Sequence, residues 1–100
     1  MKKFDMKNIF QKKEQNTNSQ LVRFTPVNFK EAKSISNELI DGNVVYINVK
    51  NISAQEAARL LDFVSGVLYS INGKAKRVSS EAYLLAPNDE LLNRFTNETN

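Results

Sequence analysis

The stretch from Ser53 to Pro87 constrains the fold most, because it joins a helical pattern to a hairpin pattern. Apolar residues from Ala57 to Ile71 recur at steps of three, four and seven, as on one face of an amphipathic helix. The tetrapeptide SAQE at the start of this pattern is a capping box, and Asn72-Gly73 after it is a helix stop. These signals predict one long helix.

Gly66 lies in the middle of this pattern, where glycine costs about 1 kcal/mol relative to alanine. Two interpretations stay open. The helix ends at Gly66 and residues 67–71 form a strand that turns at Asn72-Gly73, or the helix continues through the glycine. We favour the continuous helix because the periodicity crosses Gly66 unbroken. A glycine retained there indicates the close approach of another helix and a surface for self-association.

The hairpin pattern consists of predicted strands at 74–78 and 82–86, joined by a turn at 79–81 and ended by Pro87. Its register stays open. A three-residue turn sets Arg77 opposite Tyr83 on one face of the hairpin, whereas a two-residue turn puts them on opposite faces.

The first part of the domain contains two strand patterns and one helix pattern. Residues 21–25 read as a strand that ends before Pro26. A helix over about 28–40 follows, opened by an N-cap asparagine with glutamate three positions later and ended at Gly42. The sequence VVYINV at 44–49 is almost continuously apolar, which is typical of a central strand covered on both faces.

These elements predict an α/β fold, a compact two-layer sandwich in the order β-α-β-α-β-β. In a two-layer sandwich the second face of the sheet needs another cover. The apolar outer side of the 44–49 strand therefore indicates a symmetric partner, and we expect a dimerising domain. The sequence DELLNRF after the hairpin predicts one or two helical turns, and residues 97–100 are expected to fray.

The net charge of +3 lies entirely in residues 1–20, which hold five lysines and two acidic residues. Within residues 1–13, an apolar stripe with neighbouring positive charge suits a helix at a membrane surface. The stripe consists of Met6, Ile9 and Phe10, and the charges are Lys7, Lys12 and Lys13. A disordered basic tail is the alternative. Residues 14–20 read as a short polar linker.

Composition argues against several function classes. Residues 21–100 are balanced in charge, so we expect no nucleic acid partner for the folded domain. The chain has no cysteine and no histidine, which removes the usual zinc ligands, the commonest general base and the serine or cysteine triads. We therefore expect that the protein is not an enzyme and that it binds no metal ion and no cofactor. An enzyme that uses Asp62 or Glu56 and a small regulatory ligand-binding domain remain as alternatives.

The segment LLDFVSGVLYSINGKAKRVSSEAYLLAP, with the helix and the apolar strand before it, resembles the bacterial cell division protein family SepF over residues 21–87. The resemblance implies an adaptor that binds the C-terminal peptide of FtsZ, aligns or bundles FtsZ filaments and tethers them to the membrane. It also implies a core that dimerises and polymerises, and a cytoplasmic protein held at the inner face of the cell membrane at the division site.

The resemblance also implies residue roles and boundaries. Gly66 matches a family glycine tied to core association. The helix pattern itself leaves Phe63 either as a peripheral core aromatic or, with Val67, as part of a second helix face buried in a dimer. Arg77 and Tyr83 match positions that bind the FtsZ peptide, in a groove that Leu85 and the long helix would line. Tyr83 replaces the more usual phenylalanine, and the linker is shorter than usual in the family. The implied core is 21–88, followed by a tail at 89–100.

Overall fold

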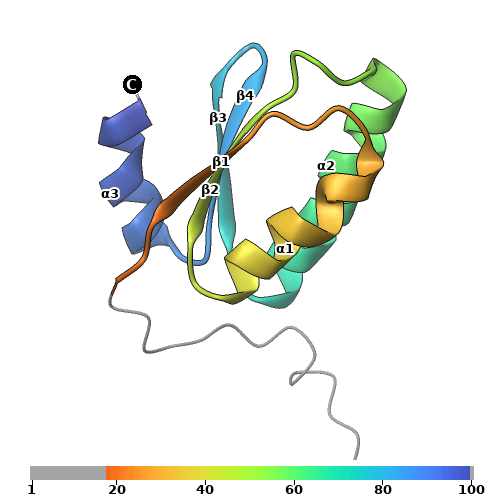
Figure 1. The fold of residues 1–100 in the computed structure, drawn as a ribbon. Helices are drawn as coiled ribbons and strands as arrows, with labels where there is room; N and C mark the ends of the chain where they lie inside the picture. Colours follow the sequence, from red (N-terminus) through yellow and green to blue (C-terminus); the bar gives the residue numbers. More distant parts are fainter. Residues whose placement is uncertain (1–17, 100) are drawn as a thin grey trace, which may run out of the picture.

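The computed structural model describes residues 18–99, which form one mixed β-sheet with helices packed on it (Figure 1). The predicted α/β class and the order β-α-β-α-β-β are confirmed. The elements are β1 (Leu21–Phe24), the 3-10 helix η2 (Phe29–Glu31), α1 (Ala32–Ile40), β2 (Val44–Asn48), α2 (Ala54–Ser70), β3 (Lys74–Ser79), β4 (Ala82–Ala86) and α3 (Asp89–Thr99). The predicted membrane stripe of Met6, Ile9 and Phe10, with Lys7, Lys12 and Lys13, lies outside the described residues.

The four strands lie in the order β1-β2-β4-β3. β2 pairs in parallel with β1 and antiparallel with β4, which in turn pairs antiparallel with β3. The prediction that residues 44–49 form a central strand is confirmed, since Val44, Val45 and Ile47 are fully buried. β1 and β3 are the two edges of the sheet.

α1 and α2 lie side by side on one face of the sheet (Figure 1). Their apolar stripes meet the side chains of β2 and β4 that face them. The resulting core contains Ala32, Ile35, Leu39, Val45, Ile47, Leu60, Val64, Leu68, Ile71 and Leu85. This first core is the one that the helical periodicities predict.

The ends of the first helical segment follow its local sequence. The Asn28 side chain accepts a hydrogen bond from the Lys30 amide at 2.9 Å, which caps the 3-10 turn before α1. Glu31 reaches back one residue further than a capping box requires, and accepts from the Val27 amide at 2.9 Å. At the other end Gly42 has φ 95°, a left-handed conformation that suits glycine at a helix C-terminus.

α2 runs without interruption through Gly66 to Ser70, so the alternative strand at 67–71 is wrong. Ser53 caps its start by accepting from the Glu56 amide at 3.2 Å. Asn72 takes φ 60° after its end, and the Gly73 amide donates to the Leu68 carbonyl at 2.7 Å. This is a Schellman-type ending, in which a left-handed residue lets the chain turn back and satisfy the last carbonyls.

The second face of the sheet carries α3, on the opposite side from α1 and α2 (Figure 1). Leu91 and Phe95, one helical turn apart, pack on Val44, Leu84 and Ala86 to form a second core. The Asn88 side chain accepts from the Leu91 amide at 2.8 Å, which starts the helix. α3 is 11 residues long, more than the one or two turns predicted, and it extends into the residues expected to fray.

The chain thus supplies helical cover for the sheet face that led us to expect a symmetric partner. Dimerisation stays a prediction.

Two glycines differ sharply in their surroundings, and this contrast predicts opposite effects on stability. A Cβ at Gly73 would lie 2.7 Å from a Leu68 methyl carbon and 2.8 Å from the Ala86 carbonyl oxygen, whereas a Cβ at Gly66 meets nothing within 4 Å. Gly73→Ala should lower the free energy of unfolding by about 1–3 kcal/mol through overpacking. Gly66→Ala should raise it by up to about 1 kcal/mol through helix propensity. Urea unfolding at low protein concentration measures both, and equal midpoints for the two variants would contradict the contrast.

Candidate functional site

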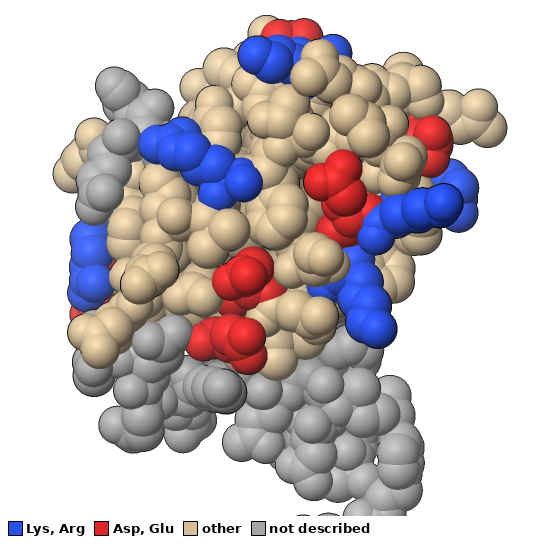
Figure 2. All heavy atoms as spheres, in the orientation of Figure 1, with Lys and Arg blue, Asp and Glu red and all other residues tan. Residues whose placement is uncertain are grey.

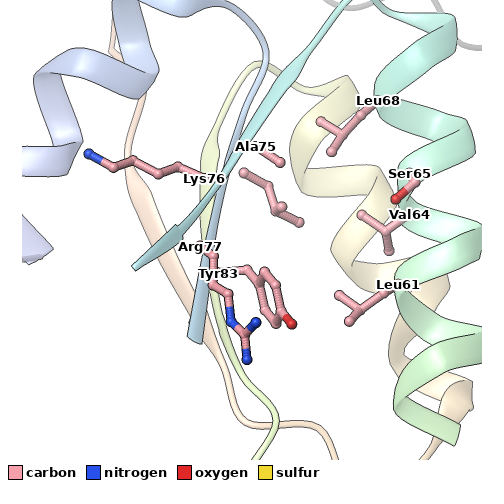
Figure 3. A pocket seen from close by; sticks show the side chains of 9 residues that line it. Leu61, Val64, Ser65, Leu68, Ala75, Lys76, Arg77 and Tyr83 are labelled. Carbon is pink, nitrogen blue, oxygen red and sulfur yellow. The ribbon is translucent and has the colours of Figure 1, made fainter. Parts of the chain in front are cut away.

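A groove of about 290 Å³ lies between α2 and the β3–β4 hairpin (Figure 3). Its lining is mostly apolar, with the hydroxyls of Ser65 and Tyr83 and the guanidinium of Arg77 among it. The lining residues are Leu61, Val64, Ser65, Leu68, Ala75, Lys76, Arg77, Tyr83 and Leu85. Arg77 and Tyr83 point into the space between hairpin and helix, whereas the Lys76 side chain points away from α2 (Figure 3).

The two walls of the groove come from two periodicities. In α2, residues three or four apart share one side of the helix, and these residues form one wall. In the hairpin, Ala75 pairs with Leu85 and Arg77 pairs with Tyr83. Residues two apart in a strand share a face, so all four hairpin residues face α2. The groove therefore follows from where α2 crosses this edge of the sheet.

The pairing of Arg77 with Tyr83 depends on a β-bulge. Ser79 pairs with Ala82, so the connecting loop has two residues, yet the register shifts between Arg77 and Ser79. A bulge inserts one extra residue on one strand and restores the facing that a simple two-residue turn would invert. The two-residue turn and the shared face occur together, although we predicted them as alternatives.

Arg77 is exposed and its guanidinium is held by the hairpin turn. Its Nε donates to the Ser79 carbonyl at 3.1 Å and its Nη2 donates to the Ser80 carbonyl at 2.7 Å. The guanidinium carbon lies 5.7 Å from the centre of the Tyr83 ring. A guanidinium has five N–H donors, so these two bonds leave donors for a carboxylate. The turn thus positions a cation beside a half-buried aromatic ring at the groove.

The residues predicted for self-association do not share one surface. Phe63 is 46% exposed and its ring meets the Phe29 ring edge to face at 5.8 Å. Gly66 is exposed as well, and nothing within the described residues approaches its Cβ position. Val67, in contrast, is only 5% exposed, because it is on the side of α2 turned toward the interior. The outer surface of α2 therefore offers Phe63 and Gly66 to a partner, but not Val67.

Sequence reasoning missed two features of α2. It assigned the long helix to the groove without saying which of its residues take part, although the spacing of Leu61, Ser65 and Leu68 carries that signal. It also did not identify Tyr69, which is 90% exposed. The available signal was that this aromatic residue lies outside the apolar stripe of the helix.

The two carboxylates considered for an enzyme do not form a pair at the groove. Glu56 accepts a hydrogen bond from the Phe29 amide at 3.0 Å and so ties α2 to the start of the first helical segment. Asp62 is exposed on α2 and does not line the groove. Among residues 18–99, no group of three or more Asp, Glu, His or Cys side chains is placed to hold a metal ion.

The face seen in Figure 2 mixes acidic and basic side chains over a largely uncharged surface. This mixture on the visible face matches the charge balance of residues 21–100. Within the part of the chain that the structure describes, no helix is both long enough and apolar enough to span a bilayer.

The fold and the groove define a small α/β domain with an open, cation-rimmed site at one edge of its sheet. A sequence model described as "Cell division protein SepF" matches residues 21–90. The chain belongs to the SepF family of cell division proteins.

Curated relatives carry the same description. The Cell division protein SepF of Oceanobacillus iheyensis is 32% identical over 75% of this chain and 52% of its own length. That of Oenococcus oeni is 35% identical over 71% of this chain and 39% of its own length, and that of Alkaliphilus oremlandii is 37% identical over 73% and 50%. The match thus spans about half the length of these relatives, or less.

Proposed function

We propose that this protein is a non-enzymatic cell division adaptor whose groove binds the C-terminal tail peptide of FtsZ. The observation that carries the proposal is the placement of Arg77, Tyr83 and Leu85 on one face of the hairpin, in one groove beside α2. Arg77 and Tyr83 also match the peptide-binding positions that the family resemblance implies, and Leu85 is their neighbour in the groove. The adaptor aligns or bundles FtsZ filaments and holds them at the membrane of the division septum.

The chemistry of the groove supports a peptide as its ligand. Arg77 supplies a positioned cation for acidic groups, and the Tyr83 ring and the α2 leucines supply apolar contacts. Small-molecule sites usually measure about 300–1,000 Å³ and enclose most of their ligand. This groove is at the small end, about 290 Å³, and open to solvent, which suits one or two side chains of a peptide better than an enclosed regulatory ligand.

Two further properties belong to the proposal. Residues 1–13 attach the protein to an anionic membrane through the stripe of Met6, Ile9 and Phe10, and residues 14–20 link this segment to the core at 21–88. The core associates with itself through the outer surface of α2, at Phe63 and Gly66. Association multiplies both membrane anchors and peptide sites, so that weak single contacts give strong binding to a filament.

The FtsZ proposal predicts that Arg77→Ala and Tyr83→Ala each reduce co-sedimentation of the full chain with FtsZ filaments at least fivefold. Arg77 contributes charge-assisted hydrogen bonds worth roughly 1.5–3 kcal/mol, which corresponds to tenfold or more in affinity. FtsZ lacking its C-terminal tail should not pellet the unaltered protein.

The chain offers a matched control on the opposite edge of the sheet. Arg23 pairs across strands with Tyr46, and its guanidinium carbon lies 5.0 Å from that ring centre. Arg23→Ala removes the same kind of arginine–tyrosine contact away from the groove, and should leave sedimentation unchanged. Equal losses for Arg23→Ala and Arg77→Ala would refute the assignment of the groove.

The membrane proposal predicts that the full chain floats with vesicles containing anionic lipid, and that the double substitution Ile9→Asn with Phe10→Asn abolishes flotation. The change removes apolar area and leaves the lysines in place, so it tests insertion rather than charge alone. Val27→Asn is the control, because Val27 is an apolar residue on the surface of the folded domain and is 59% exposed. Flotation of the double variant at the unaltered level would show that the apolar stripe is not the anchor.

The association proposal predicts that Gly66→Lys keeps the fold and weakens higher assembly. A Cβ at this position meets nothing within 4 Å in the described residues and Gly66 is exposed, so a lysine side chain can extend into solvent, whereas a packed partner would clash with it. Sedimentation velocity should show smaller species, and circular dichroism an unchanged spectrum. If the variant sediments like the unaltered protein, the outer surface of α2 is not an association surface.

A further inference from the structure

β3 is an edge strand with one open side. Its six residues pair only with β4 in the sheet that the structure describes, and all of them except Val78 are exposed. An edge strand presents unpaired N–H and C=O groups along its free side. β3 also forms the outer wall of the groove, through Ala75 and Arg77. An extended segment placed along this edge would lie beside the groove.

Side chains of β3 alternate between the two faces of the sheet. Ala75 and Arg77 face α2, as their partners Leu85 and Tyr83 do. Lys76 is opposite Leu84, whose side chain belongs to the core on the α3 side, and it points away from α2 (Figure 3). The edge therefore carries a cation toward each face, Arg77 on the groove side and Lys76 on the other.

The charge of this edge selects its occupant. Residues 74–77 contain three cations and no acidic residue, so pairing with a second copy of β3 would bring like charges together, which destabilises cross-strand pairs. The lysine-rich residues 1–13 are also unsuitable as an added strand along β3, because they too would bring like charges together. An acidic extended peptide has the complementary charge, and strand addition to an open edge is a recurrent mode of peptide recognition.

We propose that the peptide bound at the groove adds to the sheet as a fifth strand along β3. This inference rests on the proposed binding of the FtsZ tail and specifies its geometry. Alternate side chains of the peptide enter the groove between α2 and the hairpin, where they meet Leu61 and Tyr83. The side chains between them face Lys76. The preferred peptide therefore carries acidic residues on the Lys76 side, and on the groove side apolar residues with one acidic residue where it meets Arg77.

Amide hydrogen exchange, followed by NMR on the full chain with and without a saturating synthetic FtsZ tail peptide, tests the geometry. Strand addition uses the outward N–H groups of alternate residues only. Every second amide in β3 should therefore exchange at least about tenfold more slowly with peptide, since each gains a hydrogen bond that must open before exchange. The amides of β1, at the opposite edge, should not change and serve as the internal control.

The outcomes separate the two proposals. Peptide binding with alternating protection in β3 supports strand addition. Binding that shifts the resonances of Arg77 and Tyr83 without protecting β3 amides overturns strand addition and leaves the peptide site intact. Absence of any binding by the tail peptide overturns the proposed function and this inference with it.

A pair of charge reversals gives a second measurement. Lys76→Glu should weaken peptide binding fivefold or more, although its side chain points away from α2 (Figure 3). Lys33→Glu, at an exposed position of α1, makes the same change in net charge and should alter affinity less than twofold. Equal effects of the two substitutions would show that only net charge matters, and would contradict a peptide lying along β3.

Discussion

The register of β4 is the constraint on which both cores and the groove depend. β4 pairs with β2 on one side and β3 on the other, and its residues face the two helical layers alternately. Leu84 and Ala86 belong to the core under α3, whereas Leu85 belongs to the core under α1 and α2. A slip by one residue would exchange these two sets. Both faces are buried, so such a slip costs apolar burial on both sides.

The register of β4 also determines which residues line the groove. Because Tyr83 and Leu85 must face α2, any residue paired with them on β3 faces α2 as well. The bulge between Arg77 and Ser79 lets a two-residue loop close the hairpin without disturbing that requirement. The hydrogen bonds from Arg77 to the turn carbonyls then hold the guanidinium at the bulged end. A structural device for closing a hairpin thus also positions the cation of the proposed peptide site.

Features that depend on contacts between residues close in sequence could be predicted, whereas features that depend on tertiary packing could not. The ends of α2 rest on contacts within a few residues, from Ser53 to Glu56 and from Leu68 to Gly73, and local pattern suffices for these. The continuously apolar run AYLLA at 82–86 indicates that β4 is buried on both faces, but it does not report the length of the turn or the bulge that adjusts the register. The full length of α3 depends on tertiary packing and was not predictable from spacing alone. The burial of Val67 was available from spacing, because Val67 lies three residues after Val64 and four before Ile71 on the apolar stripe of α2.

The start of the folded domain and the hairpin turn lie at opposite ends of the sheet. The Ser19 hydroxyl donates to the Gly42 carbonyl at 2.8 Å, and the Gln20 amide donates to the Asn43 side chain at 3.1 Å, which ties the start of the core to the turn before β2. Val45 pairs with Leu85 and Asn48 with Ala82, so the hairpin turn lies at the other end of the sheet (Figure 1).

In the proposed adaptor, the membrane segment therefore joins the core at one end, while Arg77 is near the other. If residues 14–20 form the short linker that we propose, they would hold the core close to the bilayer. The length of the sheet, rather than the linker, would then separate a bound FtsZ tail from the lipid surface. A longer linker in a relative would relax that spacing without altering the groove, because none of residues 18–60 lines it.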